Sequence, residues 1–361
     1  MSDQKPLLSI CIPTYNRSKF LRVMLQALLP QVAEFGEQVE VWVIDNASPD
    51  ETPAVVEESR ALGPFQYCRN ESNIGPLLNV LKGPSELAEG EFVWVLGDHN
   101  LIRSGALGRI LKGVSANSSV DVLYSNFRCA VYPDQWPADA LAGYNGPFQC
   151  LGNLRTDDGP VQRWRDLVGP ENSFCTQVYA HVVRTQIWRD YWRSFALDQP
   201  YLNAQTTYPH TKMIVDRLFD APSHYLGEPA ITIFNGAQSW GNPVTQCAVF
   251  LNGLRDLVNE FGRRGVDAAI ISEWKRGFCT VETSRVLSSA IRSLGVCSVF
   301  MKVIRASPFE LYLWQAFWIG FCQSDCNFLA RQVVRASNAV RGYPKWWIFN
   351  CRPVRWVRRI L

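Results

Sequence analysis

The chain of 361 residues carries a formal net charge of +3, and hydrophobic residues make up 47% of it. A chain of this length and apolar content buries a sizeable core and divides into two or three domains. The small net charge excludes nucleic-acid binding driven by bulk electrostatics, and no run of about 18 uninterrupted apolar residues predicts a membrane-spanning helix.

The first 125 residues alternate strand-like and helix-like patterns. Apolar runs predict strands over residues 7–13, 39–44, 65–68, 91–96 and 120–124. Helical spacing predicts helices over residues 19–29, 76–88 and 104–114, and Pro30 is expected to end the first of them. This alternation predicts an α/β fold with a doubly wound, mostly parallel sheet that is flanked by helices.

The pattern changes in the second half of the chain. Residues 130–160 are rich in Pro, Gly and Asp and predict a loop or lid. Strand and helix pieces return between Trp164 and Asn235, and from residue 243 almost to the end the pattern is helical. We therefore expect the helical C-terminal region to be separate from the α/β part.

The eleven cysteines are scattered from Cys11 to Cys351, without a C-x-x-C pair. Scattered thiols inside apolar runs are typical of reduced, buried cysteines in a reducing compartment. Residues 1–6 lack the pattern of an export signal. Together these features predict a cytoplasmic protein.

The first polar cluster directly follows the first predicted strand. Its members are Pro13, Thr14, Tyr15, Asn16 and Arg17. Backbone N–H groups at a strand end and at the N-terminus of the next helix favour the negative charge of a phosphate. The arginine adds a cation for the same group. The cluster equally suits a capped helix start without a ligand, and both interpretations stay open.

Two further clusters follow the second and third strands. Asp45 ends the second strand, where a carboxylate can accept hydrogen bonds from a base or ribose. Asn73, Gly75 and Asn79 follow the third strand, and their amides suit the same partners. Helix capping and ordinary turn chemistry are the alternatives for these residues.

The fourth predicted strand ends in the turn Gly97-Asp98-His99-Asn100. Carboxylate oxygens suit Mg²⁺, and an imidazole suits Mn²⁺. An ion that bridges two phosphates would neutralise a departing nucleotide diphosphate. We therefore predict a divalent metal, Mn²⁺ or Mg²⁺, on Asp98, His99 and Asn100. A plain turn without a metal is the alternative.

These four clusters, in this order, resemble the motifs of family 2 glycosyltransferases of the GT-A fold. Within that family the chain is similar to the abequosyltransferase-like branch, which assembles bacterial surface glycans. The resemblance implies inverting transfer from a nucleoside diphosphate sugar donor. It implies that Pro13, Tyr15, Asp45 and Asn73 hold the nucleoside, with Asp98 and Asn100 on the metal. The family usually has several acids in this turn, so Asp98 alone predicts weaker metal binding.

The resemblance also implies the division of the chain. Residues 1–125 would form the nucleotide-sugar-binding half of a GT-A domain, and residues 126–242 the acceptor-binding half. Residues 243–361 would form the helical C-terminal region.

Inverting transfer needs a group that deprotonates the acceptor hydroxyl. Relatives often place an acid at the start of a helix, and the comparable point here is Tyr208-Pro209-His210. We predict His210 as the base because its intrinsic pKa is near neutral. Metal ligation and helix capping are its alternatives. Asp198 and Glu171 are the other candidates for the base.

The sequence after Asp325 contains no acidic residue. It carries basic residues interleaved with aromatic ones: Arg331, Arg335, Arg341, Lys345, Arg352, Arg355, Arg358 and Arg359, with Trp346, Trp347, Phe349 and Trp356. This mixture predicts contact with an anionic membrane surface. Such contact suits the lipid-linked glycan acceptor, at the inner face of the bacterial inner membrane, that the resemblance implies; a polysaccharide acceptor is the alternative. A packed helical subdomain and nucleic-acid binding are the alternatives, and the low net charge opposes the second.

Two other functions compete with glycosyl transfer. A sugar nucleotidyltransferase would need a Gly-rich phosphate loop after the first strand, and residues 13–17 are not one. The other competing function is that of a catalytically weak scaffold protein that binds a nucleotide sugar. The single acid of the Asp98 turn supports this alternative.

Overall fold

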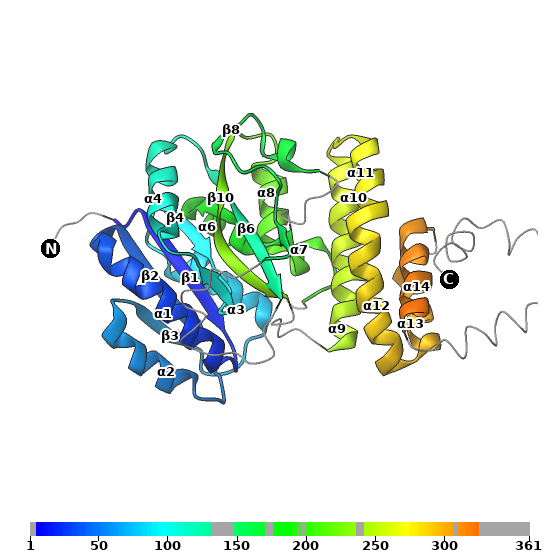
Figure 1. Ribbon diagram of the computed structural model, residues 1–361, viewed down its shortest axis with the longest axis horizontal. Helices are drawn as coiled ribbons and strands as arrows, with labels where there is room; N and C mark the ends of the chain where they lie inside the picture. Colours follow the sequence, from blue (N-terminus) through cyan, green and yellow to red (C-terminus); the bar gives the residue numbers. More distant parts are fainter. Residues whose placement is uncertain are drawn as a thin grey trace, which may run out of the picture. The chain divides into compact units, whose positions relative to one another are not determined.

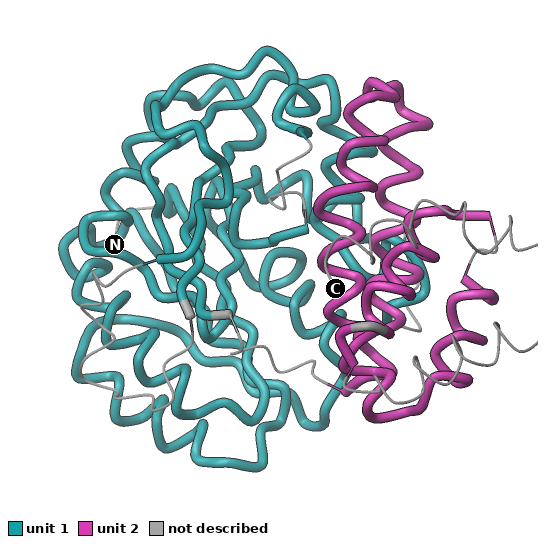
Figure 2. The backbone as a smooth tube through the Cα atoms, turned by 45° about the vertical axis from the view of Figure 1, so that its right-hand side comes forward, with its two compact units in different colours: residues 1–239 teal, residues 240–361 magenta. Residues whose placement is uncertain are grey.

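The computed structural model describes residues 5–131, 148–169, 176–193, 195, 200–235, 242–306 and 309–324. The chain separates into two compact units, residues 1–239 and 240–361 (Figure 2). All described strands belong to the first unit, and the described part of the second unit is helical.

Parallel strands form one half of the sheet in the first unit (Figure 1). In spatial order they are β3 (Gln66–Arg69), β2 (Val39–Asp45), β1 (Leu8–Thr14) and β4 (Phe92–Val95). β1 and β2 are almost entirely buried, as expected for apolar strands that are covered on both faces. The helices α1 (Ser18–Phe35), α2 (Thr52–Ser59) and α3 (Pro76–Lys82) connect these strands.

The other half of the sheet mixes strand directions. β9 (His181–Arg184) pairs antiparallel with both β4 and β6 (Val122–Val131), and β10 (Ser223–Asn235) runs parallel to β6. Three short strands pair antiparallel: β5 (Asn100–Ile102) and β8 (Gly159–Val161) with β10, and β7 (Cys150–Leu151) with β6. The predicted α/β class with a mostly parallel sheet flanked by helices is thus confirmed.

The remaining helices of the first unit are short. They are α4 (Ala106–Ala116), α6 (Thr185–Trp192), α7 (Ala204–Thr207) and α8 (Pro209–Arg217). A π-helical turn, Gly83–Leu87, continues α3. Single 3₁₀ turns lie at Gly36–Gln38, Arg60–Leu62, Trp164–Leu167 and Val178–Ala180.

The prediction that Pro30 ends the first helix is wrong, because α1 continues through it to Phe35. A proline inside a helix removes one backbone hydrogen bond and costs about 3 kcal/mol. The neighbouring side chains of Leu28, Leu29 and Val32 are fully buried. Each such side chain contributes roughly 1.5–3 kcal/mol on burial, which outweighs the proline.

The predicted end of the fifth strand and the predicted loop also need correction. β6 continues to Val131 instead of ending at Tyr124, and β7 and β8 fall within the predicted loop of residues 130–160. The polar residues Asn126 and Arg128 disguised the strand, although both are buried in it. Asn126 donates to the carbonyls of Asn153 and Gly227, which satisfies its buried amide. Residues 132–147 lie outside the described part. The predicted boundary at residue 125 falls inside β6.

The second unit packs its helices around aromatic side chains. Its helices are α9 (Pro243–Ala248), α10 (Arg255–Arg263), α11 (Ala268–Trp274), α12 (Thr280–Leu294), α13 (Val296–Ala306) and α14 (Leu311–Gln323), with π-helical turns at Val249–Leu254 and Lys275–Cys279. Phe261, Trp274 and Phe317 are among its fully buried side chains. Across the part of the chain that the structure describes, no helix has both the length and the apolar character to cross a bilayer.

Candidate functional site

The four predicted clusters meet at the carboxyl edge of the parallel strands. The register pairs Thr14 with Asp45 and Asp45 with Arg69, so that β1, β2 and β3 end level with one another. Direct hydrogen bonds then join the loops that follow these strands. The separate sequence motifs therefore form one site at the edge where ligands of such sheets bind.

Asp98 is the centre of the first group of contacts. Thr14 Oγ1 donates to Asp98 Oδ2 over 2.9 Å, and Arg17 Nε donates to Asp98 Oδ1 over 2.9 Å. The side chains of Arg17 and Asp98 are only 9% and 5% exposed. The guanidinium carbon of Arg17 also lies 4.0 Å from the centroid of the Phe20 ring. The guanidinium is thus fixed between a carboxylate and an aromatic face.

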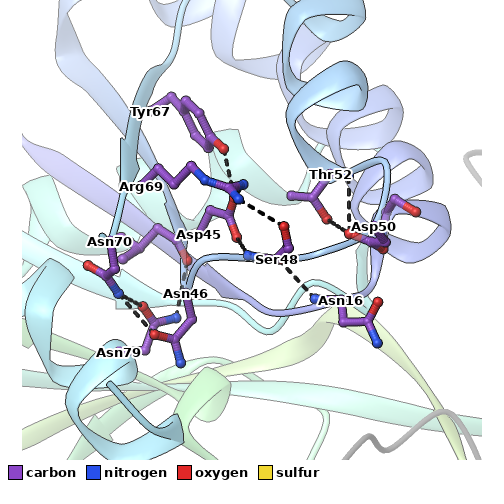
Figure 3. A network of polar contacts seen from close by, with 12 residues as sticks. Asn16, Asp45, Asn46, Ser48, Asp50, Thr52, Tyr67, Arg69, Asn70 and Asn79 are labelled. Atoms are coloured by element: carbon purple, nitrogen blue, oxygen red, sulfur yellow. Dashed lines mark hydrogen bonds and ion pairs between the residues drawn. The ribbon is translucent and has the colours of Figure 1, made fainter. Parts of the chain in front are cut away.

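Asp45 is the centre of the second group (Figure 3). The backbone N–H of Ser48 donates to its Oδ1 over 2.8 Å, while Tyr67 Oη and Arg69 Nη1 donate to its Oδ2 over 2.7 and 2.6 Å. Burial, followed by the hydrogen bond to Asp45, raises the pKa of Tyr67 to about 12. Asp45 is completely buried, whereas the Arg69 side chain is 39% exposed. Arg69 and Tyr67 are therefore the groups that reach solvent here.

Asparagine side chains tie the loop after β3 to the loop after β2. Asn46 Nδ2 donates to Asn73 Oδ1 over 2.8 Å, and Asn46 Oδ1 accepts from the backbone N–H of Ile74 over 2.9 Å. Asn73 also accepts from the N–H of Gly75, whose φ of +86° favours glycine. Asn79 is buried and donates to the carbonyl of Ile44, so it holds α3 against β2.

The N-terminus of α1 already receives a carboxylate. The backbone N–H of Ser18 donates to Asp50 Oδ2 over 2.9 Å. The N–H of Asn16 donates to Ser48 Oγ over 2.9 Å (Figure 3). Although burial raises it, hydrogen bonds from Thr52 and Ser18 lower the pKa of Asp50. A phosphate at this helix N-terminus would therefore meet the negative charge of Asp50. Arg17 is the cationic residue of the first cluster.

The first cluster also presents two less buried side chains. Pro13 is half-buried, and the ring of Tyr15 is 42% exposed beside Thr14. Asn16 and Ala47 adopt left-handed backbone conformations, with φ of +55° and +59°. These conformations shape the two loops that the Asn16–Ser48 hydrogen bond connects.

The side chains of the Asp98 turn, where a divalent metal is predicted, already have partners within the fold. Asn100 is completely buried, and its Oδ1 accepts from the N–H of Gly97 over 2.6 Å. His99 Nδ1 lies 3.1 Å from Asp98 Oδ1, the oxygen that Arg17 also contacts. Within the described ranges, no three His, Cys, Asp or Glu side chains come together as a metal site.

Charge bears on the same turn. Its single carboxylate is already compensated by the charge of Arg17. A divalent ion at Asp98 would be repelled by this guanidinium and attracted by the carboxylate, so it would compete with Arg17 for the same oxygen.

His210 lies in the first turn of α8 and is buried in the fold. Its ring centroid is 5.8 Å from that of His181, which is also buried. Burial, together with His181, lowers the pKa of His210 well below its ordinary value. A neutral imidazole is a proton acceptor, but a strongly lowered pKa makes it a weak base. The other two predicted bases, Asp198 and Glu171, lie outside the described residues.

Several residues of the site were missed in the sequence. Tyr67 and Arg69 were not expected, although both belong to the third predicted strand and its end. Asn46 and Asn70 were also missed, and Asn70 donates to Asn46 and to Asn79. Their shared signal is position, because each lies within a residue or two of a strand end at the edge where ligands bind.

Comparisons with known proteins identify the family of the chain. A family profile described as Glycosyl transferase family 2 matches residues 9–213, more than half of the chain. The abequosyltransferase RfbV of Salmonella typhimurium is 25% identical over 233 residues, which cover 62% of this chain and 66% of that protein. The GalNAc(5)-diNAcBac-PP-undecaprenol beta-1,3-glucosyltransferase of Campylobacter jejuni is 31% identical over 123 residues, or 34% of this chain and 38% of that protein.

A solved structure matches over nearly the whole chain. The crystal structure of S. aureus TarS 1-349 in complex with UDP has a TM-score of 0.50 and 18% identity, and the match covers 91% of this chain and 92% of that one. By contrast, the chain spans less than two thirds of the length of either curated relative.

Proposed function

The chain belongs to glycosyl transferase family 2 and has the GT-A fold, and from this premise we propose that it transfers a sugar from a nucleoside diphosphate sugar. One observation carries the proposal: the loops after the parallel strands are joined by hydrogen bonds into a single polar edge. The TarS structure holds UDP, which supports a nucleotide-sugar donor for a chain of this fold.

The described contacts suggest how this edge would bind the donor. The nucleoside would lie against Tyr15, Pro13 and the Asn73–Gly75 loop, where Arg69 presents N–H donors and the hydroxyl oxygen of Tyr67 is an acceptor. Asp45 would act mainly by orienting these two side chains, because it is buried beneath them. The diphosphate would lie toward Arg17 and Asp98.

We propose the inverting form of transfer, in which the acceptor hydroxyl attacks the anomeric carbon while a base removes its proton. His210 stays a predicted base, and its burial also suits a structural role in which it packs α8 against the neighbouring His181. A His210→Gln variant separates the two. Loss of kcat with an unchanged melting temperature supports catalysis, and a lower melting temperature with little change in kcat supports packing.

We further propose a lipid-linked acceptor and contact with the inner face of the bacterial inner membrane. The name of the Campylobacter relative includes PP-undecaprenol, a lipid-linked carrier. In the second unit, Met301 on α13 and Leu311 and Trp318 on α14 are at least 44% exposed. The basic, Trp-containing sequence after Asp325 follows α14 directly. Such apolar and basic groups suit an anionic lipid surface.

The first experiment is a donor screen with the purified full chain. UDP-, GDP-, dTDP- and CDP-sugars are tested by thermal shift and by release of nucleoside diphosphate, with and without Mn²⁺ or Mg²⁺. We expect the sugar nucleotides of one base to raise the melting temperature, and their nucleoside diphosphate to be released slowly. Binding without any turnover, even after lipid-linked acceptor extract is added, would favour the scaffold alternative. No response to any nucleotide would contradict the proposal.

Two further assays test the membrane contact and the rival nucleotidyltransferase activity. Flotation with vesicles of anionic or neutral lipid tests the membrane contact, and we expect binding to the anionic vesicles only. Incubation with nucleoside triphosphates and sugar 1-phosphates tests nucleotidyl transfer. We expect no pyrophosphate from that reaction.

A further inference from the structure

We propose that Cys129 and Cys150 form a site of reversible oxidation, at which exchange with a low-molecular-weight disulfide joins β6 to β7 covalently. Cys129 belongs to β6 and Cys150 to β7, both in the first unit. The proposal does not depend on the proposed function, because it concerns two thiols and not the donor. It departs from the sequence-based expectation that the cysteines are buried and stay reduced.

The first argument is that the two cysteines lie directly opposite each other in the sheet. β6 and β7 pair antiparallel, and the register places Cys129 against Cys150. The N–H of Gln149 donates to the carbonyl of Cys129 over 2.6 Å, and the N–H of Gly152 donates to that of Phe127 over 2.8 Å. Opposite residues of an antiparallel pair have Cα atoms about 4.5–5.5 Å apart, within the range of about 4.4–6.8 Å that a disulfide spans.

The second argument is that the two side chains share one face of the sheet. A Cβ at Gly152 would overlap the ring of Phe127, so the next opposed positions of this register also meet on one face. The Phe127 ring contacts the buried ring of Tyr179, with 5.3 Å between centroids. Burial, followed by the charges of Cys129 and Cys150, raises the pKa of Tyr179 well above its ordinary value. Both thiols therefore lie near the same phenol.

The third argument is access to a reagent. Cys150 is exposed and Cys129 is half-buried. By contrast, burial raises the pKa of the Cys247 thiol to about 11 and that of the Cys279 thiol to about 12. Because a thiol reacts as its thiolate, these buried cysteines are inert. In the strand pairings of the described residues, Cys129 and Cys150 are the only two cysteines that face each other.

The reaction is a thiol–disulfide exchange with oxidised glutathione or a similar disulfide. The thiolate of the exposed Cys150 attacks one sulfur of that disulfide, and one glutathione leaves as its thiolate. Cys129 then loses its proton to water and attacks the Cys150 sulfur, and the second glutathione leaves. Two protein thiols are oxidised, and one disulfide is reduced to two thiols. In a reducing compartment the exchange runs backward, so the bond forms only under oxidising conditions.

The bond would lie at the edge of the sheet that carries the candidate site. β9 runs antiparallel to both β4 and β6, so β4 and β6 end at the same edge. Cys129 is two residues from the carboxyl end of β6. Oxidation would therefore fix β7 to β6 at that edge.

The decisive experiment is oxidation of the purified full chain with glutathione disulfide, followed by alkylation of the remaining thiols and digestion at aspartate. Asp134 and Asp139 lie between the two cysteines, so their peptides stay together only through the bond. Mass spectrometry should find these peptides joined, and separate after reduction. Absence of the joined peptides, or their formation only in chain unfolded by urea, would overturn the inference.

Serine variants locate the reaction at this pair. Cys129→Ser should leave one glutathione on Cys150, because no second thiol displaces it, and Cys150→Ser should lose the joined peptides. Cys297→Ser, at an exposed position on α13, is the matched control and should form the bond as wild type does.

Thermal melting shows whether the bond fits the native fold. Oxidised wild type should melt about 3–10 °C above the reduced chain, because the bond closes a ring in the unfolded chain, and Cys129→Ser should lack this shift. A lower melting temperature on oxidation would mean that the bond forces β7 away from β6, and would overturn the inference.

Discussion

Two buried carboxylates at opposite ends of the same strands are held in different ways. At the amino end, Glu40 of β2 accepts from the hydroxyl of Ser9, from the backbone N–H of Gly90 over 3.0 Å and from Trp42 Nε1 over 3.2 Å. At the carboxyl end, Asp98 accepts from Thr14 and from the charged Arg17. Each carboxylate joins segments that are far apart in the sequence.

The difference lies in the charge of the partners. Among the contacts described, the partners of Glu40 are neutral groups of the fold itself, so they have nothing to offer an anionic ligand. Arg17 is a cation at the edge where ligands of such sheets bind, so a phosphate can share it. We therefore expect the carboxylate at the amino end to stabilise the sheet alone, and, under the proposed function, the one at the carboxyl end also to orient a cation toward the donor.

The largest expected effect comes from Asp98→Ala. Transfer should fall by about a thousandfold or more, because Arg17 loses the group that orients it. The free energy of unfolding should also fall by about 3 kcal/mol, since a buried charge is left unpaired. Steady-state kinetics and urea denaturation measure the two effects. Retained turnover in a folded variant would show that the two carboxylates do not differ in function.

An acid titration tests a buried group with no charged partner among its described contacts, His181 at the start of β9. Burial lowers the pKa of His181 to about 4, so the folded chain keeps it neutral while the unfolded chain takes up a proton near pH 6.5. Stability is therefore present above pH 6.5 and is lost as the pH falls toward about 4, by roughly 3 kcal/mol. Urea denaturation at several pH values should show this slope, and His181→Gln should reduce it. An unchanged slope in the variant would assign acid sensitivity to other groups.

Glu40→Gln should affect stability alone. The variant replaces an acceptor oxygen by an amide that faces other donors, so we expect a loss of about 2 kcal/mol in the free energy of unfolding. Nucleotide affinity should stay within twofold of wild type. Glu34→Gln, an exposed position on α1, is the control for the change of charge. Weaker nucleotide binding in Glu40→Gln would break the distinction between the two ends.

Tyr67→Phe should give the smallest change. It removes one hydrogen bond to Asp45, which keeps Arg69 and the N–H of Ser48. The expected loss is about 1 kcal/mol of stability, with nucleotide affinity reduced only a few-fold. Thermal melting and calorimetry measure both quantities. A loss as large as that of Asp98→Ala would mean that the hydroxyl contacts the nucleotide directly.

The sequence was informative where a strand is continuously apolar and ends in a polar residue. The parallel strands and the edge that gathers Arg17, Asp45, Asn73 and Asp98 follow from such runs and from the rule that parallel strands share a carboxyl edge. β6 was cut short because its buried polar residues find partners in distant loops, and β5 was missed because Asn100 looked like part of a turn. The sequence pattern of a single strand does not show which distant residues its polar side chains will contact.

The contacts within the site depend on how the strands align with one another in the sheet. That Arg17 would meet Asp98, and Arg69 would meet Asp45, follows from pairings between segments separated by 81 and 24 positions. Other contacts decide that Asn100 and Asn79 point into the fold, namely those with the N–H of Gly97 and the carbonyl of Ile44. The family resemblance supplied the roles of these residues, but their partners came from the structure, and the roles stay predictions until they are measured.

The left-handed residues Asn16 and Ala47 have a consequence for the thermodynamics of binding. For a residue with a Cβ, this conformation costs roughly 1–2 kcal/mol, and Asn tolerates it better than Ala. The hydrogen bonds from Asn16 to Ser48 and from Ser48 to Asp45 hold the loops in this shape against the strain. Under the proposed function, little backbone entropy then remains to be lost on binding. Association should accordingly be fast, with a heat-capacity change set by the surface of the ligand and not by ordering of the chain. Ala47→Gly would relax the strain, so it should stabilise the free protein while making nucleotide binding entropically less favourable.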